Sequence, residues 1–255
     1  MHAFYRAELL IGKGGVDNLR DARVAVIGVG GVGSYAAEAL ARAPIGHLVL
    51  IDDDRIVASN INRQIHATTH TVGDFKAEVM ARRIRMINPQ AEVVAVTRRF
   101  TSNSADELLS DDLDYVVDAI DDVDAKVLLL QKCVVRSLSV VSSMGAASKL
   151  DPSAVRVDDI SRSFFCPLAR RVRKQLRLSG IKTGIKVVYS TEPPILARSG
   201  DDQPASESSQ NTPLRGTISY LPPIFGFHCA ATVIQDLLHS VTFQRQGENC
   251  LKRPS

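Results

Sequence analysis

Short apolar runs rich in β-branched residues alternate with amphipathic stretches over the first 145 residues of the chain. The apolar runs occupy residues 23–27, 47–51, 92–96, 115–120 and 138–143. Helical patterns lie between them, near residues 33–43, 72–88, 103–110 and 124–136. Continuous apolar runs are typical of strands buried on both faces of a parallel sheet. The alternation therefore predicts an α/β fold with a doubly wound, mostly parallel sheet, whose ligands bind at the carboxyl ends of the strands.

The regular alternation stops after Gly145. Residues 154–160 and 186–191 predict two further strands, and residues 166–178 predict a helix. Residues 221–238 predict a buried helix, because prolines and polar residues interrupt their apolar run, which is too short to span a membrane.

The residue pattern predicts a single domain over residues 1–255. A nucleotide-binding core occupies about 20–145, and a C-terminal α+β elaboration that faces the substrate occupies about 146–240. Residues 197–213 are polar, rich in serine and interrupted by proline, which predicts a mobile loop.

A glycine-rich loop, Gly28-x-Gly30-Gly31-x-Gly33, joins the first apolar run to the first predicted helix. Gly28 allows a sharp turn, Gly30 lets the backbone approach a phosphate, and Gly33 lets the helix pack close to its strand. The start of that helix presents free N–H groups and a partial positive charge to an anion. Asp52 ends the second apolar run, where a carboxylate can accept hydrogen bonds from ribose hydroxyls. This Rossmann-like pattern predicts nucleotide binding.

The segment after the second run distinguishes a triphosphate from a dinucleotide. Arg63 and Lys76 supply two cations, and Asn60 supplies a neutral donor, as a γ-phosphate requires. A nicotinamide cofactor would leave these two cations without a purpose. The sequence contains no G-x-x-x-x-G-K-[ST] motif, so a P-loop ATPase is excluded. The alternatives are that Arg63 and Lys76 are solvated surface charges and that Asn60 caps a turn or helix.

Asp121 follows the fourth apolar run, where a parallel sheet delivers its ligands. We predict that Asp121 holds Mg²⁺ against the phosphates, with Asp54 as a further ligand. The alternative is that Asp121 caps the helix that follows.

The charge of the chain is unevenly distributed. The formal net charge is +3, yet residues 161–186 contain eight basic residues and no acidic one. Arg170, Arg173, Lys174 and Arg177 fall on one face of the helix predicted over 166–178, which suits binding to RNA phosphates. A solvated charged face is the alternative. Aromatic residues make up 5% of the chain, and the adjacent pair Phe164-Phe165 gives little indication of a base-stacking platform.

Together these motifs resemble the ubiquitin-activating-enzyme-like adenylyltransferases. The resemblance rests on the glycine loop, Asp52-x-Asp54, Ser59-Asn60-x-x-Arg63-Gln64, Lys76 and Asp118-x-x-Asp121. It implies that Gln64 also contacts the nucleotide. The segment Tyr5-Arg6-Ala7-Glu8 resembles the N-terminal segment of that superfamily. It implies that Arg6 reaches the ATP phosphates of a partner subunit, and hence a homodimer.

Further motifs are similar to the tRNA threonylcarbamoyladenosine dehydratase branch of the superfamily. They are Arg63-Gln64-Ile65-His66-Ala67, Lys76-Ala77-Glu78-Val79-Met80, Asp118-Ala119-Ile120-Asp121, Lys149-Leu150-Asp151-Pro152 and Tyr189-Ser190-Thr191-Glu192. This resemblance implies a cytoplasmic enzyme that uses ATP and Mg²⁺ to adenylate the threonyl carboxylate of the modified adenosine in tRNA and then to close a ring. Arg6, Arg63, Lys76 and Asp121 are its expected catalytic residues. His66, Thr191 and Glu192 are expected near the substrate, and a sulfur-relay protein is a further expected partner.

Two other functions stay open at this level. One is adenylation of the C-terminus of a small sulfur-carrier protein, and the other is a non-catalytic nucleotide sensor that keeps the fold. Cys166 precedes Pro167 at the start of the basic helix. We interpret it as a small packed residue and not as a thioester-forming nucleophile.

Overall fold

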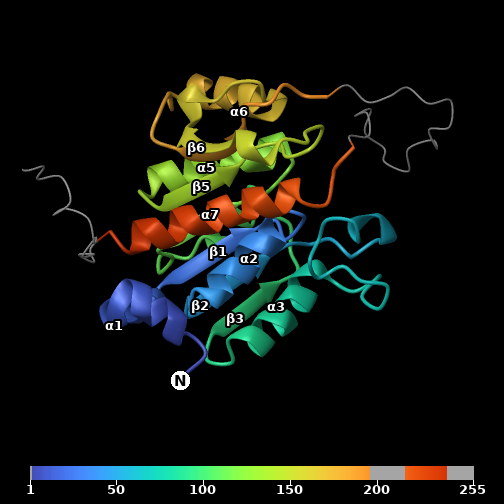
Figure 1. The fold of residues 1–255 in the computed structure, drawn as a ribbon. Helices are drawn as coiled ribbons and strands as arrows, with labels where there is room; N and C mark the ends of the chain where they lie inside the picture. The colour runs from blue at the N-terminus through green and yellow to red at the C-terminus, as the bar shows by residue number, and fades with distance from the viewer. Residues whose placement is uncertain (1, 196–215, 240–255) are drawn as a thin grey trace, which may run out of the picture.

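The computed structural model describes residues 2–195 and 216–239, so the loop predicted at 197–213 lies outside the described residues. These residues build one seven-stranded sheet covered by helices on both faces (Figure 1). The strands are β1 (Arg23–Ile27), β2 (His47–Ile51), β3 (Glu92–Val96), β4 (Tyr115–Asp118), β5 (Ser139–Ser143), β6 (Val155–Asp159) and β7 (Lys186–Ser190). The helices are α1 (Tyr5–Asp21), α2 (Gly33–Arg42), α3 (Lys76–Ile87), α4 (Ala105–Leu108), α5 (Val123–Val135), α6 (Pro167–Leu178) and α7 (Leu221–Leu237).

The strand order is β3-β2-β1-β4-β5-β7-β6. All neighbours pair in parallel except β6 and β7, which are antiparallel. Ile27 at the end of β1 is in register with both Ile51 and Asp118, and Asp118 with Ser142. The carboxyl ends of the central strands therefore meet at one edge, and the order reverses between β1 and β4, where ligands bind in such sheets. The predicted α/β class is confirmed, and the elaboration adds β7 and the antiparallel edge strand β6 to the same sheet.

Alternate residues of the central strands pack into two different cores. Val24 and Val26 of β1 face α2, α3 and α7, whereas Ala25 and Ile27 face α4 and α5. A third cluster joins α5 and α6 to the β5–β7 half of the sheet. Both faces are covered, which explains why the strands read as continuous apolar runs.

Three helices differ from the sequence expectation. The pattern near 72–88 predicted an earlier start, but α3 begins at Lys76 because residues 71–74 form turns and an antiparallel bridge to Arg55 keeps Phe75 extended. The helix expected at 103–110 is the single turn α4. No helix was predicted over α1, which Gly12 interrupts with φ +72° and ψ 170°.

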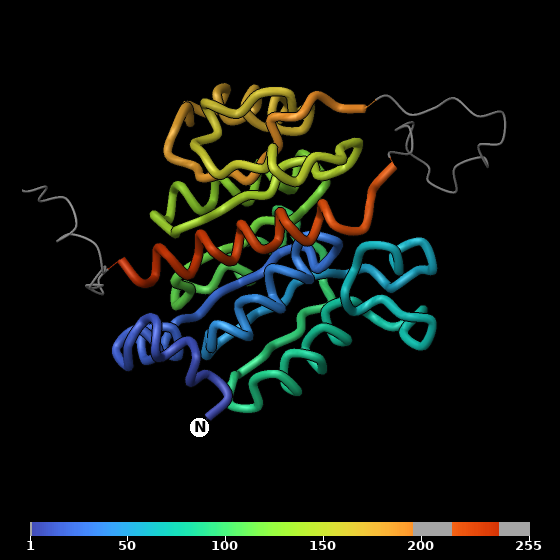
Figure 2. Tube along the Cα trace, viewed as in Figure 1, coloured from blue at the N-terminus to red at the C-terminus, as the bar shows by residue number. Residues whose placement is uncertain are grey.

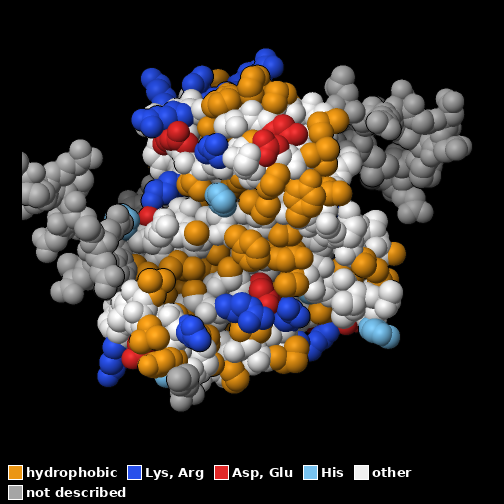
Figure 3. Space-filling view, viewed as in Figure 1, with side chains coloured by type: hydrophobic (Ala, Val, Ile, Leu, Met, Phe, Trp, Pro, Cys, Tyr) orange, Lys and Arg blue, Asp and Glu red, His pale blue; other side chains and the backbone are white. Residues whose placement is uncertain are grey.

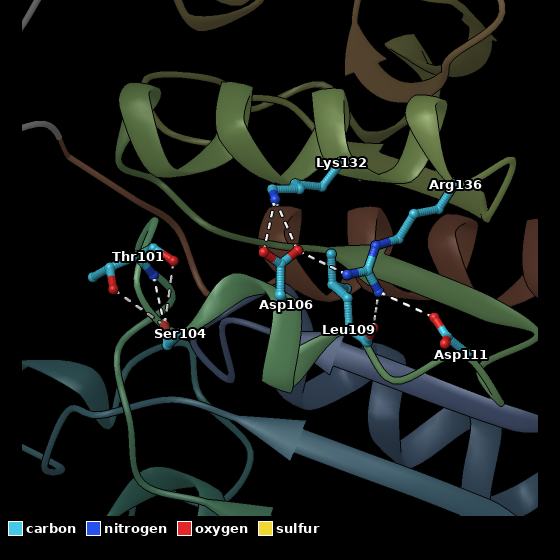
Figure 4. A network of polar contacts seen from close by, with 7 residues as sticks. All are labelled: Thr101, Ser104, Asp106, Leu109, Asp111, Lys132 and Arg136. Carbon is cyan, nitrogen blue, oxygen red and sulfur yellow. Dashed lines mark hydrogen bonds and ion pairs between the residues drawn. The ribbon is translucent and has the colours of Figure 1, made fainter.

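Polar contacts attach the single turn of α4 to α5 (Figure 4). The Asp106 carboxylate accepts hydrogen bonds from Lys132 Nζ at 2.8 Å and from Arg136 Nη2 at 2.7 Å. Arg136 also donates to the carbonyl of Leu109. Ser104 Oγ accepts the N–H of Thr101 at 2.9 Å and so closes the turn before α4. These surface contacts add to the burial of Ala105 and Leu108, which holds in place a helix too short to be stable alone.

Helix α7 lies across one face of the sheet beside α2, as the Cα trace shows (Figure 2). Leu221, Phe225, Cys229 and Val233 are fully buried in the core that α2 and α3 also cover. The predicted buried helix is confirmed. No helix in the described part of the chain is both long and apolar enough to cross a membrane.

Candidate active site

The glycine loop connects β1 to α2 at the carboxyl edge of the sheet. Gly28 has φ +87°, and a Cβ at that position would lie 2.7 Å from the carbonyl oxygen of Ala119 in the loop after β4. A Cβ on Gly33 would lie 1.8 Å from the carbonyl oxygen of Gly28. Both positions therefore require glycine, and the loop is held against the segment that carries Asp121.

The structure brings Arg63 and Gln64 against this loop. A Cβ added to Gly31 would lie 3.3 Å from Arg63 Cγ, and one added to Gly30 would meet, among the described residues, only Gln64 Nε2 at 3.9 Å. Arg63 Nη1 donates to the Ser59 carbonyl at 2.8 Å and to Asn62 Oδ1 at 2.9 Å. These bonds fix the guanidinium beside the glycine loop. The open side of Gly30 leaves space for a ligand to approach the backbone.

Asn60 is buried and its Oδ1 accepts the N–H of Val57 at 3.2 Å. The capping alternative for Asn60 is therefore realised. Three neighbouring polar side chains differ, because their buried atoms have no hydrogen-bond partner within the described residues. They are Ser34 Oγ in the first turn of α2, Gln64 Oε1 and both ring nitrogens of His66. A polar ligand such as ATP, bound at the glycine loop, would provide hydrogen-bond partners for these buried atoms.

Asp52, Asp54 and Lys76 form a connected cluster beside the loop. Asp52 Oδ2 accepts the N–H of Val29 at 2.6 Å, and its Oδ1 accepts the N–H of Asp54 at 2.9 Å. Burial raises the pKa of Asp52, although the charge of Lys76 and these two N–H groups oppose the shift. Lys76 Nζ donates to Asp54 Oδ2 at 2.6 Å. The buried lysine is thus paired with a carboxylate and is not the solvated surface charge of the alternative interpretation.

His66 is buried close to Lys76 and Arg83. Burial, followed by the positive charges of Lys76 and Arg83, lowers the pKa of His66 to about 4. The imidazole is therefore neutral at physiological pH and offers one donor and one acceptor.

Asp121 is exposed after β4, and among residues 2–195 and 216–239 no side chain pairs with its carboxylate. The alternative that Asp121 caps the next helix is wrong, because Asp122 does so. Asp122 Oδ1 accepts the N–H of Ala125 at 2.8 Å. The carboxylate of Asp121 therefore stays available at the carboxyl edge.

A buried ion pair beneath this loop was not predicted from the sequence. Lys126 Nζ donates to Asp118 Oδ2 at 2.7 Å, and both side chains are 0% exposed. Asp118 Oδ2 also accepts from Ser142 Oγ at 2.6 Å, and its Oδ1 accepts the N–H of Ile120 at 3.1 Å. The pair fixes the first residues of the segment that leads to Asp121. The one indication of this ion pair in the sequence is that a lysine interrupts the apolar face of the helix predicted at 124–136.

Arg6 lies apart from the other predicted site residues. It is exposed in the first turn of α1, which packs at the amino-terminal end of the sheet, opposite the glycine loop (Figure 1). The carbonyl of Leu19 near the end of α1 accepts the N–H of Gly46, just before β2 begins. Arg6 therefore does not reach the glycine loop of its own chain.

The basic face of α6 is only partly as predicted. Arg170, Lys174 and Arg177 are exposed. Arg173 is half-buried, and its Nη1 donates to the carbonyl and hydroxyl of Ser163, both at 2.7 Å. Arg173 therefore ties α6 to the preceding turn.

Glu192 and Thr191, which the resemblance places near the substrate, have structural partners. The Glu192 carboxylate accepts the N–H groups of Leu150 and Asp151, each at 2.9 Å. Thr191 Oγ1 donates to the Ala154 carbonyl at 3.2 Å. These contacts hold the two motifs together. Cys166 is buried and packs close to Gly145.

Comparison with known proteins identifies the class that this geometry defines. The model of the ThiF family matches residues 5–250, and the chain belongs to that family. A tRNA threonylcarbamoyladenosine dehydratase of Bacillus subtilis is 40% identical over 96% of this chain and 98% of its own length. The Escherichia coli protein of the same name is 35% identical over 93% of each chain. Its crystal structure in complex with ATP has a TM-score of 0.83 at 34% identity, covering 93% of this chain and 94% of the other.

Proposed function

We propose that this chain is an ATP-dependent dehydratase of N6-threonylcarbamoyladenosine in tRNA. The observation that carries the proposal is the glycine loop with Arg63 and Gln64 against it and unpaired buried atoms of Ser34 and Gln64 beside it. The similarity to dehydratases over nearly the whole chain supports the same reading. A Thermus thermophilus sulfur carrier protein adenylyltransferase matches only 47% of this chain, at 37% identity.

The reaction needs positioning and charge neutralisation more than proton transfer. The threonyl carboxylate is ionised at neutral pH and attacks the α-phosphorus of ATP, so that pyrophosphate leaves and an acyl-adenylate forms. The neighbouring carbamoyl group then attacks the acyl carbon, expels AMP and closes a ring. In this proposal Arg63 and Lys76 neutralise charge on the phosphates. Asp52 contacts the ribose, while Gly28, Gly30, Gly31, Gly33, Asn60 and Gln64 line the nucleotide.

Mg²⁺ would be held by Asp121, with Asp54 as a second carboxylate. The unengaged carboxylate of Asp121 fits a hard cation that prefers oxygen ligands. Such an ion would neutralise the charge of the phosphates. The pairing of Asp54 with Lys76 ties the predicted ion ligand to the predicted phosphate cation.

A homodimer is part of the proposal, with Arg6 acting on the partner subunit's site. Two features of α1 support it. Helix α1, whose first turn carries Arg6, lies at the opposite end of the sheet from the glycine loop of its own chain, and the neighbouring Leu9 and Leu10 are 66% and 80% exposed. Exposed apolar side chains beside a functional arginine suit a contact between subunits.

Subunit mixing tests the shared site. Arg6→Ala and Arg63→Ala should each be inactive, whereas their mixture should recover about a quarter of wild-type turnover, since half of the dimers are mixed and each of these holds one intact site. No recovery after mixing would contradict the donation of Arg6 across the interface.

The tRNA contact is proposed for Arg170, Lys174 and Arg177 on the exposed face of α6, with Arg173 holding the helix in place. A cytoplasmic location and a sulfur-relay partner stay predictions from the resemblance.

Mass spectrometry of tRNA nucleosides after incubation with ATP and Mg²⁺ tests the main proposal. We expect threonylcarbamoyladenosine to lose the mass of one water and AMP to accumulate in equal amount. An unchanged nucleoside would refute the proposal. AMP release stimulated by a protein ending in Gly-Gly, and not by tRNA, would establish the sulfur-carrier alternative.

A further inference from the structure

Two aromatic rings stand exposed at the N-terminal end of α6. The side chains of Phe164 and Phe165 are 48% and 55% exposed, with ring centroids 5.3 Å apart and planes at 71°. The ring of Phe164 also packs edge-on against the buried Tyr189, at 5.8 Å. Tyr189 thus supports the pair from within the protein and leaves aromatic surface open to solvent. The Phe164-Phe165 pair gave little indication of a stacking platform at the level of the sequence, because residue composition does not reveal the exposure of a side chain.

The backbone holds this pair in a strained conformation. Phe165 has φ +51°, in the left-handed region that a bulky side chain rarely adopts. The next residue, Cys166, caps α6 by accepting the N–H of Ala169 on Sγ at 3.4 Å. Strain of this kind gathers at sites that contact ligands. Here it turns the chain so that the rings face outward before the helix begins.

The pair lies on the same edge of the sheet as the candidate active site. Cys166 packs against Gly145, which follows β5, and Tyr189 lies near the carboxyl end of β7. Three strand steps separate β1 from β7, and at about 4.8 Å per step the offset is about 14 Å. A few nucleotides of single-stranded RNA can cover that distance.

Unpaired cations begin one turn beyond the rings. Within the described residues, no hydrogen bond or ion pair engages the side chains of Arg170, Arg171, Lys174, Arg177 or Lys182. With a rise of about 1.5 Å per residue, Arg170, Lys174 and Arg177 follow Cys166 by about 6, 12 and 16 Å along the helix. Figure 3 shows Lys and Arg side chains gathered over α6, with hydrophobic side chains beside them.

We propose that Phe164 and Phe165 form a stacking platform for an unpaired base of single-stranded RNA, whose phosphates continue along the cations of α6. This inference rests on the proposed function, since it names how the RNA substrate is held. Aromatic faces next to cations are the usual combination for unpaired nucleotides. The absence of any acidic residue from 161–186 favours a polyanion over a protein of mixed charge.

A fluorescence titration tests the platform directly, because the chain contains no tryptophan. Phe164→Trp introduces a single indole at the platform. We expect its emission to be quenched in a saturable way by an RNA hairpin that carries an unpaired loop. A blunt RNA duplex of equal length should leave it nearly unchanged. The matched control is Met86→Trp, at a 76% exposed position on α3, which should respond to neither RNA. No quenching by the hairpin, or equal quenching by the duplex, would overturn the proposal.

A steady-state assay separates stacking from apolar contact. The double variant Phe164→Leu/Phe165→Leu keeps apolar side chains but removes the aromatic faces. We expect the KM for tRNA to rise about tenfold, as the loss of a stacked base implies, while the KM for ATP stays unchanged. An unchanged KM for tRNA would refute stacking and favour an apolar protein contact at this surface.

These readouts also distinguish failure of the platform from failure of the proposed function. Quenching by the hairpin requires no turnover. A quenched indole without loss of water from the nucleoside would therefore keep the platform and reject the dehydratase. Dehydration of the tRNA nucleoside without quenching of the indole would keep the dehydratase and reject the platform.

Discussion

Removing the buried lysine Lys126 should destabilise the protein severely. The substitution Lys126→Met keeps the length of the side chain but leaves the Asp118 carboxylate, which is 0% exposed, without its cation. Asp118 would keep only the hydroxyl of Ser142 and the N–H of Ile120 as partners. The carbonyl of Ser143, which accepts from Lys126 Nζ at 3.0 Å, would also lose its donor.

The expected loss is about 3–5 kcal/mol in the free energy of unfolding, the usual result of removing one member of a buried ion pair. With a urea slope of about 2.5 kcal/mol per M, the unfolding midpoint would fall by roughly 1.5 M. The double variant Lys126→Met/Asp118→Asn should lose less than Lys126→Met alone, because it leaves no uncompensated charge. Urea unfolding followed by circular dichroism measures both.

Lys132→Met is the matched control on the same helix. Lys132 pairs with Asp106 at the surface, and surface pairs contribute little, so its unfolding midpoint should stay close to that of the wild type. The reasoning would be refuted if Lys126→Met behaved like Lys132→Met. It would also be refuted if the loss in the double variant equalled the sum of the losses in Lys126→Met and Asp118→Asn.

Three further outcomes are expected. Arg63→Ala and Lys76→Ala should each lower AMP release at least about a hundredfold, because each removes a group that stabilises charge on the phosphates. Circular dichroism should show that both variants keep the fold. Near-normal rates in both variants would contradict the triphosphate geometry. His66 is neutral when folded, with a pKa of about 4 against 6.5 when unfolded, so the unfolded chain binds the extra proton and stability falls as the pH drops below 6.5. Urea unfolding should show a loss of about 2 kcal/mol between pH 7 and pH 5, and His66→Asn should lose less over the same interval. The variant Arg170→Gln/Lys174→Gln should reduce the slope of log affinity for tRNA against log salt by about 2, and an unchanged slope would place the RNA elsewhere.

The central fold could be predicted because local and long-range signals agree there. The strands β1, β2 and β4 are largely buried on both faces, so their apolar runs mark them without reference to neighbours. The helix α1 gave no such signal. The helix is interrupted at Gly12. Leu9 and Leu10 before the interruption are exposed, whereas Val16 and Leu19 after it are buried.

The candidate site could be predicted where residue types sit at a fixed spacing from a strand end. Arg63 was expected beside the glycine loop, and it lies against Gly31. The pairs that depend on folding could not be foreseen. Lys126 meets Asp118 only because the first turns of α5 pack against the ends of β4 and β5. Likewise, α5 is capped by Asp122 and not by Asp121, and the residue pattern does not locate the start of a helix to within one residue.

The contact between α7 and the glycine loop sets the order in which the protein can mature during its synthesis. Pro222 lies behind Gly31, where a Cβ would come within 3.0 Å of it, and Gly226 lets α7 approach the carbonyl of Val32. The glycine loop is therefore backed by residues that lie far downstream of it in the chain and are translated after it. A nascent chain should gain affinity for ATP only after α7 has left the exit tunnel, so that incomplete chains do not sequester nucleotide.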